Sequence, residues 1–500
     1  MASRNHPSMI KSQRSNDPAD DINVLLLGHI GVGKSTFING LANYLCYDTL
    51  EEAVNDQMQV IIPSAFFWYD CDTFEEYMVK VGLNDGYEEF NEKGQSCTQQ
   101  CRSFVFQVGE KKLRIIEAPG IGDNRGLDQD NKNFQEILTF ISQYEHLNGI
   151  CILLNPNEER LTILFRFCVN ELLRHLHESA KENIIFVFTN ARSTFFQQGS
   201  ASKALRALLD EHKQKLNLEI PFTRNNIFLL DNEPFRYLAL RKNRIQLNEE
   251  LTLSYQKSWK HTIKEYSNLM RHIVTRPLHA ISNTLSLNEA GQLIRKLTHP
   301  IAETHKLIQE NIQLATQYKK YVLETNIRRL SELPSLSDID KRINDLTHEK
   351  SIIEDVYKKL SKFFCANATL PFNDAILQYH SLFIKEEQMK KKAGRQKDDV
   401  IQGLEQMMKV YEEEINLFKK TIENEKDRSY AQNVLKSDDI FPLVETLYRL
   451  PINGSKICEQ VDGLKISQIN ILSKREVVVE LPVKADLSSL MSQFKIILNK

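Results

Sequence analysis

This chain of 500 residues has few glycines, few prolines and almost no net charge. It has only 18 glycines and 14 prolines. Such low counts, together with 26% charged residues, favour long helices. The 64 Lys and Arg nearly balance the 66 Asp and Glu, which leaves a formal charge of −2. Bulk nucleic-acid binding needs a basic surplus, so we expect no nucleic-acid partner.

Cysteine is sparse and long apolar runs are missing. The eight cysteines lie in apolar segments such as 149–153, and no secretory signal precedes them. We therefore expect reduced thiols and a cytoplasmic location. No apolar run approaches the ~20 residues that a membrane helix requires, so we expect no membrane contact. The hydrophobic content of 41% still suffices for a packed core.

The composition divides the chain into four regions. Residues 1–20 are polar and aperiodic, which predicts a disordered tail. In 21–240, short apolar runs alternate with helical patterns, which predicts a mostly parallel, doubly wound α/β sheet. Residues 241–435 carry seven-residue apolar repeats, which predict an all-α bundle or coiled coil. Residues 436–500 favour a helix, although 477–479, three valines, favour a strand locally.

The α/β region contains six expected strands and four expected helices. The strands are expected at 22–27, 104–108, 113–116, 150–154, 184–189 and 227–231, and the helices at 34–47, 131–144, 158–177 and 202–216.

Three apolar series follow in the helical region. They run from Leu287 to Val322, from Leu336 to Phe364 and from Ile401 to Ile422. Pro300 and Pro334 interrupt the pattern, and proline breaks or kinks a helix. Successive helices that turn back can bury one another's apolar seams, so we expect an antiparallel bundle within the chain. The rival is an intermolecular coiled coil through the third series, which has the cleanest seam.

The strongest motif lies directly between the first expected strand and the first expected helix. Residues 28–35 match G-x-x-x-x-G-K-[ST], the P-loop that surrounds phosphates with backbone N–H groups and a helix N-terminus. Lys34 would contact the β- and γ-phosphates, and Ser35 would supply a hydroxyl to Mg²⁺. The predicted nucleotide-binding residues are Gly28, His29, Ile30, Gly31, Val32, Gly33, Lys34, Ser35 and Thr36.

A second motif follows the next pair of expected strands. Glu117-Ala118-Pro119-Gly120 places an acidic residue at the end of an apolar strand. Beside a P-loop, such a residue can hold Mg²⁺ through water, and the Gly120 N–H can contact a γ-phosphate. Without the P-loop, the same segment would indicate only an ordinary acidic turn.

The order of these motifs resembles that of the septin-like and immunity-associated (GIMAP) GTPases. That branch carries an S-x-T-x-x-C switch segment and a D-T-P-G box, which match 96–101 and 117–120 here. The resemblance covers about residues 21–240, and a group of such GTPases also has long helical C-terminal regions. It implies a P-loop G domain that binds GTP or GDP with Mg²⁺, and a homodimer through the G domain or the helical region.

The resemblance also assigns roles to individual residues. Thr98 would be the switch threonine that binds Mg²⁺, so the implied metal ligands are Ser35, Thr98 and Glu117. The implied catalytic residues are Lys34, Thr98 and Gly120. Glu117 departs from the family pattern, because the box normally begins with Asp, which is one methylene shorter.

The guanine-reading residues depart further. The family's N-K-x-D box falls at 190–193, where Asn190 is present but Ser193 replaces the carboxylate that accepts two hydrogen bonds from guanine. Asp231 and Asn232 resemble the base-proximal segment of the GIMAP group. Asp231 would either take over the guanine contact or cap the helix that begins near Glu233.

Two apolar residues predict slow hydrolysis. Ile121 stands where Ras-type GTPases place the glutamine that orients water, and Ile30 stands where they have a small residue. Asp123 and Arg125 could assist, or they are solvated switch charges. The insertion at 46–94 contains an apolar-aromatic stretch, 60–69, which is either an extra packed strand or a partner surface.

Two functions of different class fit this sequence. One is a slow GTPase switch whose helical region responds to the nucleotide. The other is a scaffold whose degenerate G domain holds nucleotide permanently and which assembles through its helices. The intact P-loop and Thr98 favour the switch, whereas Glu117, Ile121 and Ser193 favour the scaffold.

Overall fold

The computed structural model describes most of the chain up to residue 288 and separate parts beyond it. The described ranges are 21–288 without 71–73, 83–97, 99, 123–126, 158–162 and 217–218; isolated positions in 290–320 and 377–416; and 336–370, 439–458 without 456, 476–482 and 488–498. The predicted tail, Asp123, Arg125, Pro300 and Pro334 lie outside the described residues, as does most of the third apolar series.

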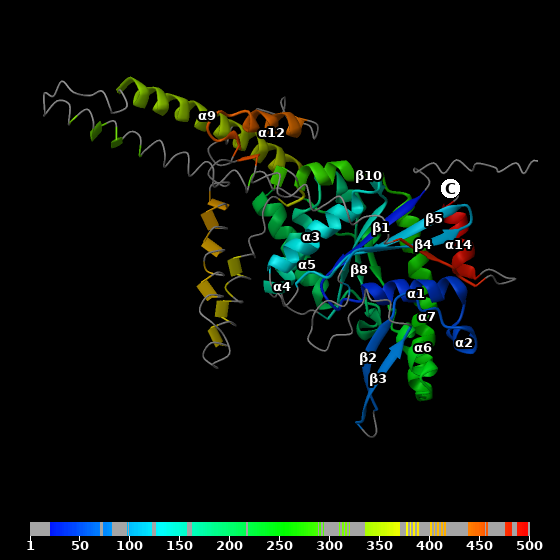
Figure 1. Ribbon diagram of the computed structural model, residues 1–500. Coiled ribbons are helices and arrows are strands. Elements are labelled where there is room, and N and C mark those ends of the chain that lie inside the picture. Colours follow the sequence, from blue (N-terminus) through cyan, green and yellow to red (C-terminus); the bar gives the residue numbers. More distant parts are fainter. Residues whose placement is uncertain are drawn as a thin grey trace, which may run out of the picture.

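A seven-stranded sheet forms the centre of the molecule, in the order β11-β4-β5-β1-β7-β8-β9 (Figure 1). Only β4 and β5 pair antiparallel. The strands are β1 Ile22–Gly28, β4 Arg102–Val108, β5 Lys111–Glu117, β7 Gly149–Leu154, β8 Ile184–Phe188, β9 Ile227–Leu229 and β11 Glu476–Val479. This confirms the predicted fold class, a mostly parallel P-loop G domain with an added helical region.

Helices cover both faces of this sheet (Figure 1). One layer contains α1 Lys34–Cys46, α6 Pro234–Lys242, α7 Glu249–Val274 and α14 Ser489–Leu498, and the other contains α3 Leu127–Ile141, α4 Ile163–Arg174 and α5 Gly199–Leu216. Strand side chains alternate between two apolar cores: Val24 and Leu26 face the α1 layer, whereas Leu25 and Leu27 face the α3 layer. Both faces are thus buried, as the continuous apolar strand sequences predicted.

Within residues 436–500, where a helix was favoured, Ile440–Tyr448 and Ser489–Leu498 are helical, whereas the three valines lie in a strand. Glu476–Val479 forms β11, which pairs parallel with β4 and extends the sheet at that edge. Arg114 of β5 fixes this strand, because its Nε lies 2.9 Å from Glu476 and its Nη1 lies 3.0 Å from Asp21. The local β propensity of the three valines therefore prevailed, since a free sheet edge was available for pairing.

Two helices after residue 240 also belong to the sheet domain. On α7, Trp259 packs edge-on against Tyr44 of α1 with 4.5 Å between ring centroids, and the Tyr266 hydroxyl donates to the Phe37 carbonyl at 3.0 Å. On α14, Leu490 and Phe494 are buried in the same core. Both segments were expected in the later helical regions, because nothing in their own sequence indicates which surface they cover.

The helical region forms a third apolar core within the chain. Leu287 and Ile294 of the first series pack in one cluster with Ile353 and Leu360 of the second, which lie on α9 Leu336–Asn367. Helix α12 Ile440–Tyr448 completes this cluster, away from the sheet (Figure 1). The first two seams therefore meet within one chain. A coiled coil through the third series stays a prediction.

The insertion before the switch segment forms a helix and a hairpin. Helix α2 spans Leu50–Asn55, and β2 Ser64–Tyr69 pairs antiparallel with β3 Glu76–Val81. Val79 and Val81 on one face of the hairpin are buried, whereas Phe67, Tyr69 and Met78 on the other face are exposed. The packed face confirms the expected extra strand, and a role of the exposed face in partner binding stays a prediction. Among the described residues, no helix is long and apolar enough to span a bilayer.

Candidate nucleotide-binding site

The P-loop connects β1 to α1 and bends through two glycines. Gly31 and Gly33 have φ angles of 75° and 99°, a left-handed region that favours glycine. Lys34 folds back over the loop, and its Nζ donates to the carbonyls of Gly28 at 3.2 Å and His29 at 3.1 Å. Burial lowers the pKa of His29, whose Nδ1 lies 2.6 Å from the Ile30 carbonyl oxygen. The loop thus holds its ammonium group at the start of α1, where phosphates bind.

Ser35, Thr98 and Glu117 come together although they are far apart in the sequence. The Ser35 Oγ donates to Glu117 Oε1 at 2.6 Å, and the Thr98 Oγ1 donates to the same oxygen at 3.4 Å. Glu117 is fully buried, and its second oxygen, Oε2, has no hydrogen-bond partner. Two hydroxyls and a carboxylate with an unused oxygen are the hard ligands that Mg²⁺ prefers. The residues present therefore fit the predicted metal.

Charge around Glu117 supports the same interpretation. Burial raises the pKa of Glu117, while the Ser35 hydrogen bond and the charges of Lys34 and Arg102 act in the opposite direction. Arg102 lies directly across from Glu117 in the β4–β5 register. A buried carboxylate whose pKa is raised by desolvation is stabilised by a cation. Arg102 was not among the predicted site residues, although a charged residue at the start of an apolar strand was a usable signal.

Gly120 and Ile121 close directly over the P-loop. The Ile30 N–H donates to the Ile121 carbonyl at 3.2 Å, and the Ile121 N–H donates to the Gly28 carbonyl at 3.2 Å. A Cβ on Gly120 would lie 2.6 Å from Ile30 Cγ1 and 2.9 Å from its Cα, so only glycine allows this approach. The Ile121 side chain points into the core of the α3 layer and is fully buried.

The base side begins at the end of β8. Asn190 has a left-handed backbone with φ 52°, and the exposed Ser193 donates from its hydroxyl to the Asn190 carbonyl at 2.7 Å. The preceding Thr189, which the sequence analysis missed, donates from Oγ1 to the P-loop carbonyl of Val32 at 2.7 Å. The loop that would read the base is thereby fixed to the loop that would hold the phosphates.

Asp231 is held by α7. Its Oδ2 accepts from the Ser258 hydroxyl and lies 3.2 Å from Arg192 Nε, while its backbone N–H donates to Thr262 Oγ1 at 3.2 Å. Burial raises the pKa of Asp231, against the effects of the Ser258 hydrogen bond, Arg192 and the Glu233 backbone N–H. Of its two carboxylate oxygens, only Oδ1 has no hydrogen-bond partner. A guanine contact by Asp231 stays a prediction.

Asn232 connects α7 to α1. Its Oδ1 accepts from the Tyr266 hydroxyl at 3.1 Å, and a Cβ on Gly40 of α1 would lie 2.8 Å from the same oxygen. The predicted base-side residues therefore depend on Ser258, Thr262 and Tyr266. None of these was found from sequence, because they lie on a helix without any nucleotide-binding motif.

No protein-family model matches the chain, and no curated protein matches it. Among solved structures, it is similar to Toc33 from Arabidopsis thaliana in complex with GDP and Mg²⁺, with 13% identity, 52% of this chain and 88% of that chain covered, and a TM-score of 0.30. A second similar structure is that of the bacterial selenocysteine-specific elongation factor EF-Sec, with 15% identity, coverage of 48% and 28%, and a TM-score of 0.20. The fold class given above rests on the strand order and the P-loop of this chain itself.

Proposed function

We propose that the protein binds guanine nucleotide with Mg²⁺ and acts as a slow GTPase switch. The observation that carries the proposal is the convergence of Ser35 and Thr98 on the buried carboxylate of Glu117, directly beside Lys34. A P-loop lysine and three hard oxygen ligands are the parts that a G domain uses for a nucleoside triphosphate.

Each of these residues has a distinct part in the proposed site. The P-loop N–H groups and Lys34 bind the β- and γ-phosphates, and Ser35 and Thr98, with Glu117, hold the metal. Bound Mg²⁺ would neutralise charge on the phosphate oxygens. The Gly120 N–H contacts the γ-phosphate, and the next residue, Ile121, is joined to the P-loop by backbone hydrogen bonds with Ile30 and Gly28. We infer that this segment responds to the nucleotide through a change in these two bonds.

A scaffold that holds nucleotide structurally is the second candidate. It is favoured by the full burial of Ile121, which removes a water-orienting side chain from the γ-phosphate, and by the engagement of Asp231 with Ser258 and Arg192. In that case the nucleotide supports packing, and the helices provide assembly. The septin-like resemblance adds that the G domains would pair.

Binding of a fluorescent GTP analogue in the presence of Mg²⁺ tests the proposal. Lys34→Ala removes the charge that faces the phosphates, so affinity should fall at least about a hundredfold. Lys242→Ala, on the exposed end of α6, is a matched control and should bind as the wild type does. Equal binding by Lys34→Ala and wild type would refute nucleotide binding at the P-loop.

Mass analysis of the nucleotide that co-purifies, followed by a turnover assay, separates the two candidates. A switch exchanges added GTP and completes several turnovers. A scaffold retains its nucleotide through purification and completes none.

A further inference from the structure

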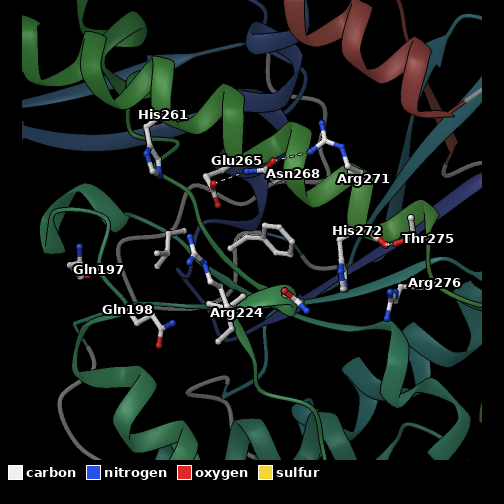
Figure 2. A pocket seen from close by; sticks show the side chains of 14 residues that line it. Gln197, Gln198, Arg224, His261, Glu265, Asn268, Arg271, His272, Thr275 and Arg276 are labelled. Atoms are coloured by element: carbon white, nitrogen blue, oxygen red, sulfur yellow. Dashed lines mark hydrogen bonds between the residues drawn. The ribbon is translucent and has the colours of Figure 1, made fainter. Parts of the chain in front are cut away.

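A cavity of about 970 Å³ lies beside β9, the edge strand of the sheet, and is remote in sequence from the P-loop. One wall is the second half of α7, and another is the turn at 224–225 that precedes β9. Figure 2 shows His261 and His272 pointing from α7 into this space, with Arg224 approaching from the opposite side. Its volume lies within the usual ~300–1,000 Å³ of small-molecule sites.

Five of the 14 residues that line the cavity are basic. Arg224, Arg271 and Arg276 contribute guanidinium groups, and Glu265 is the single carboxylate among its lining residues. Glu265 is already engaged, because its Oε1 accepts from the Asn268 amide at 3.0 Å. Arg276 reaches a carboxylate only at its Nη1, which lies 3.5 Å from Glu182. The cavity therefore has more positive charge than its own carboxylates can balance.

Three nitrogen atoms of the lining are buried without a hydrogen-bond partner. They are His261 Nε2, His272 Nε2 and Arg276 Nε. Buried polar atoms in folded proteins nearly always have partners, so unsatisfied ones at a cavity indicate a ligand or water. All three nitrogens can donate a hydrogen bond, because the imidazole tautomer can place its proton at Nε2. Arg276 Nε can only donate, and an acceptor satisfies all three nitrogens when both imidazoles carry their proton at Nε2.

The spacing along α7 explains how these groups reach one cavity. Residues 261, 265, 268 and 272 are separated by three or four positions and so lie on one face of the helix. The adjacent face carries Ser258 and Thr262, which hold Asp231. The two faces contact different residues, so variants of the cavity can leave the base side intact.

We propose that this cavity binds a small organic anion that carries two or more phosphate or carboxylate groups. Guanidinium groups pair with either kind of anion in a bidentate manner, and imidazole nitrogens supply further donors. More than one anionic group is required, because Arg224 and the α7 side chains occupy opposite walls. Phe228 of β9, whose side chain lies on the α7 side of the sheet, provides an apolar contact for the carbon framework.

Calorimetric titration of the full chain with tripolyphosphate and, separately, with citrate tests the proposal. Both titrations use the Lys34→Ala background at constant ionic strength, so that the P-loop does not contribute. Arg224→Gln with Arg276→Gln should raise the dissociation constant at least about tenfold, because each removes a charge-assisted hydrogen-bond donor. Lys260→Gln, an exposed cation on a different face of α7, should change it by less than about twofold.

The outcomes distinguish the ligand class and can refute the site. If only tripolyphosphate binds, the ligand carries phosphate groups. If only citrate binds, the ligand carries carboxylate groups. If both bind, the site accepts either kind of anion. If the double variant has a lower melting temperature than the wild type, His272→Gln is used instead, and it should also raise the dissociation constant. Absence of binding by both anions, or binding that both sets of variants leave unchanged, overturns the proposal. Nucleotide binding is measured separately by the fluorescent analogue in the wild-type background, so failure of one proposal is distinguishable from failure of the other.

Discussion

The phosphate side and the base side of the candidate site are built in different ways. On the phosphate side, Lys34 and Ser35 lie within one short loop, and their partners are backbone carbonyls and the end of the neighbouring strand. On the base side, Asp231 and Asn232 are positioned by Ser258 and Tyr266 from a helix that follows the sheet strands in sequence. A local motif therefore defines one side, and long-range packing defines the other.

This difference extends to the sheet itself. Its central strands β5, β1, β7 and β8 come from 21–240, whereas its outer strand β11 and the covering helices α7 and α14 come from later segments. The later segments carry no nucleotide-binding residues that sequence could identify, yet they bury the α1 layer. The candidate nucleotide site thus shares one packed domain with β11, α7 and α14.

Deletion of residues 476–500 is expected to have the largest effect. It removes β11 and the buried α14 side chains Leu490, Phe494 and Leu498. Burial of each such side chain stabilises by about 1.5–3 kcal/mol, and domains have only about 5–15 kcal/mol in total. We expect the truncated chain to unfold or aggregate, as measured by circular dichroism and size-exclusion chromatography.

The matched control for this deletion is Ile496→Ser, which changes an exposed position of α14 and should leave the melting temperature unchanged within about 1 °C. A truncated chain that melts cooperatively at the wild-type temperature would show that the later segments are an independent addition to the sheet.

The strands and the P-loop were predictable because their signals are local. The apolar run before residue 28 predicts β1, the motif at 28–35 predicts the P-loop, and the helical pattern after it predicts α1. None of these predictions needs the rest of the chain. The role of α7 was not predictable in this way, since Ser258 and Thr262 are ordinary helical residues until Asp231 is placed beside them. For 477–479, the strand depends on an open edge at β4, which only the assembled sheet reveals.

Ser193→Asp sharpens the comparison on the base side. The exposed Ser193 lies beside Asn190, where the family pattern has the guanine-reading carboxylate. A charged hydrogen bond contributes about 1.5–3 kcal/mol, so the variant should raise the preference for GTP over ATP roughly ten- to a hundredfold in competition titrations. Ser193→Asn supplies a similar shape without the charge and should change the preference much less.

The wild type should already favour guanine, but with measurable competition by ATP. If ATP fails to compete even in very large excess, another residue restores the specificity, and the unpartnered Oδ1 of Asp231 becomes the first to test.

Glu117→Gln tests the phosphate side through stability. Because burial raises the pKa of Glu117, ionisation of this group destabilises the folded protein. The neutral variant should therefore melt higher without ligand, by about 2–4 °C for each kcal/mol gained. The gain should be absent well below the unfolded pKa of about 4.3, should grow as pH rises from there to the higher folded pKa, and should level off above it.

If Glu117 holds Mg²⁺ as proposed, Mg²⁺ with GDP should raise the melting temperature of the same variant less than that of the wild type, because the variant lacks this ligand. Thermal melts across pH, with and without Mg²⁺ and GDP, measure both effects. A variant that melts lower than the wild type at neutral pH without ligand would contradict the assigned cost of burying Glu117.

Ile121→Gln has the smallest expected effect on rate and tests whether the phosphate side can be converted to fast hydrolysis. Ras-type GTPases orient the attacking water with glutamine at this position. Here the Ile121 side chain is fully buried in the α3 layer, so a glutamine would enter the core rather than face the γ-phosphate. Single-turnover hydrolysis should stay at or below about 10⁻³ s⁻¹ in both proteins, and the variant should melt lower because it buries an amide. Ile121→Val, which keeps the side chain apolar, should lose less stability and leave the rate unchanged.

Two other outcomes would change this interpretation. A hydrolysis rate that rises with protein concentration would indicate activation by pairing of G domains. A rate increase of more than about tenfold in the dilute glutamine variant would show that the 120–121 segment turns outward when nucleotide binds.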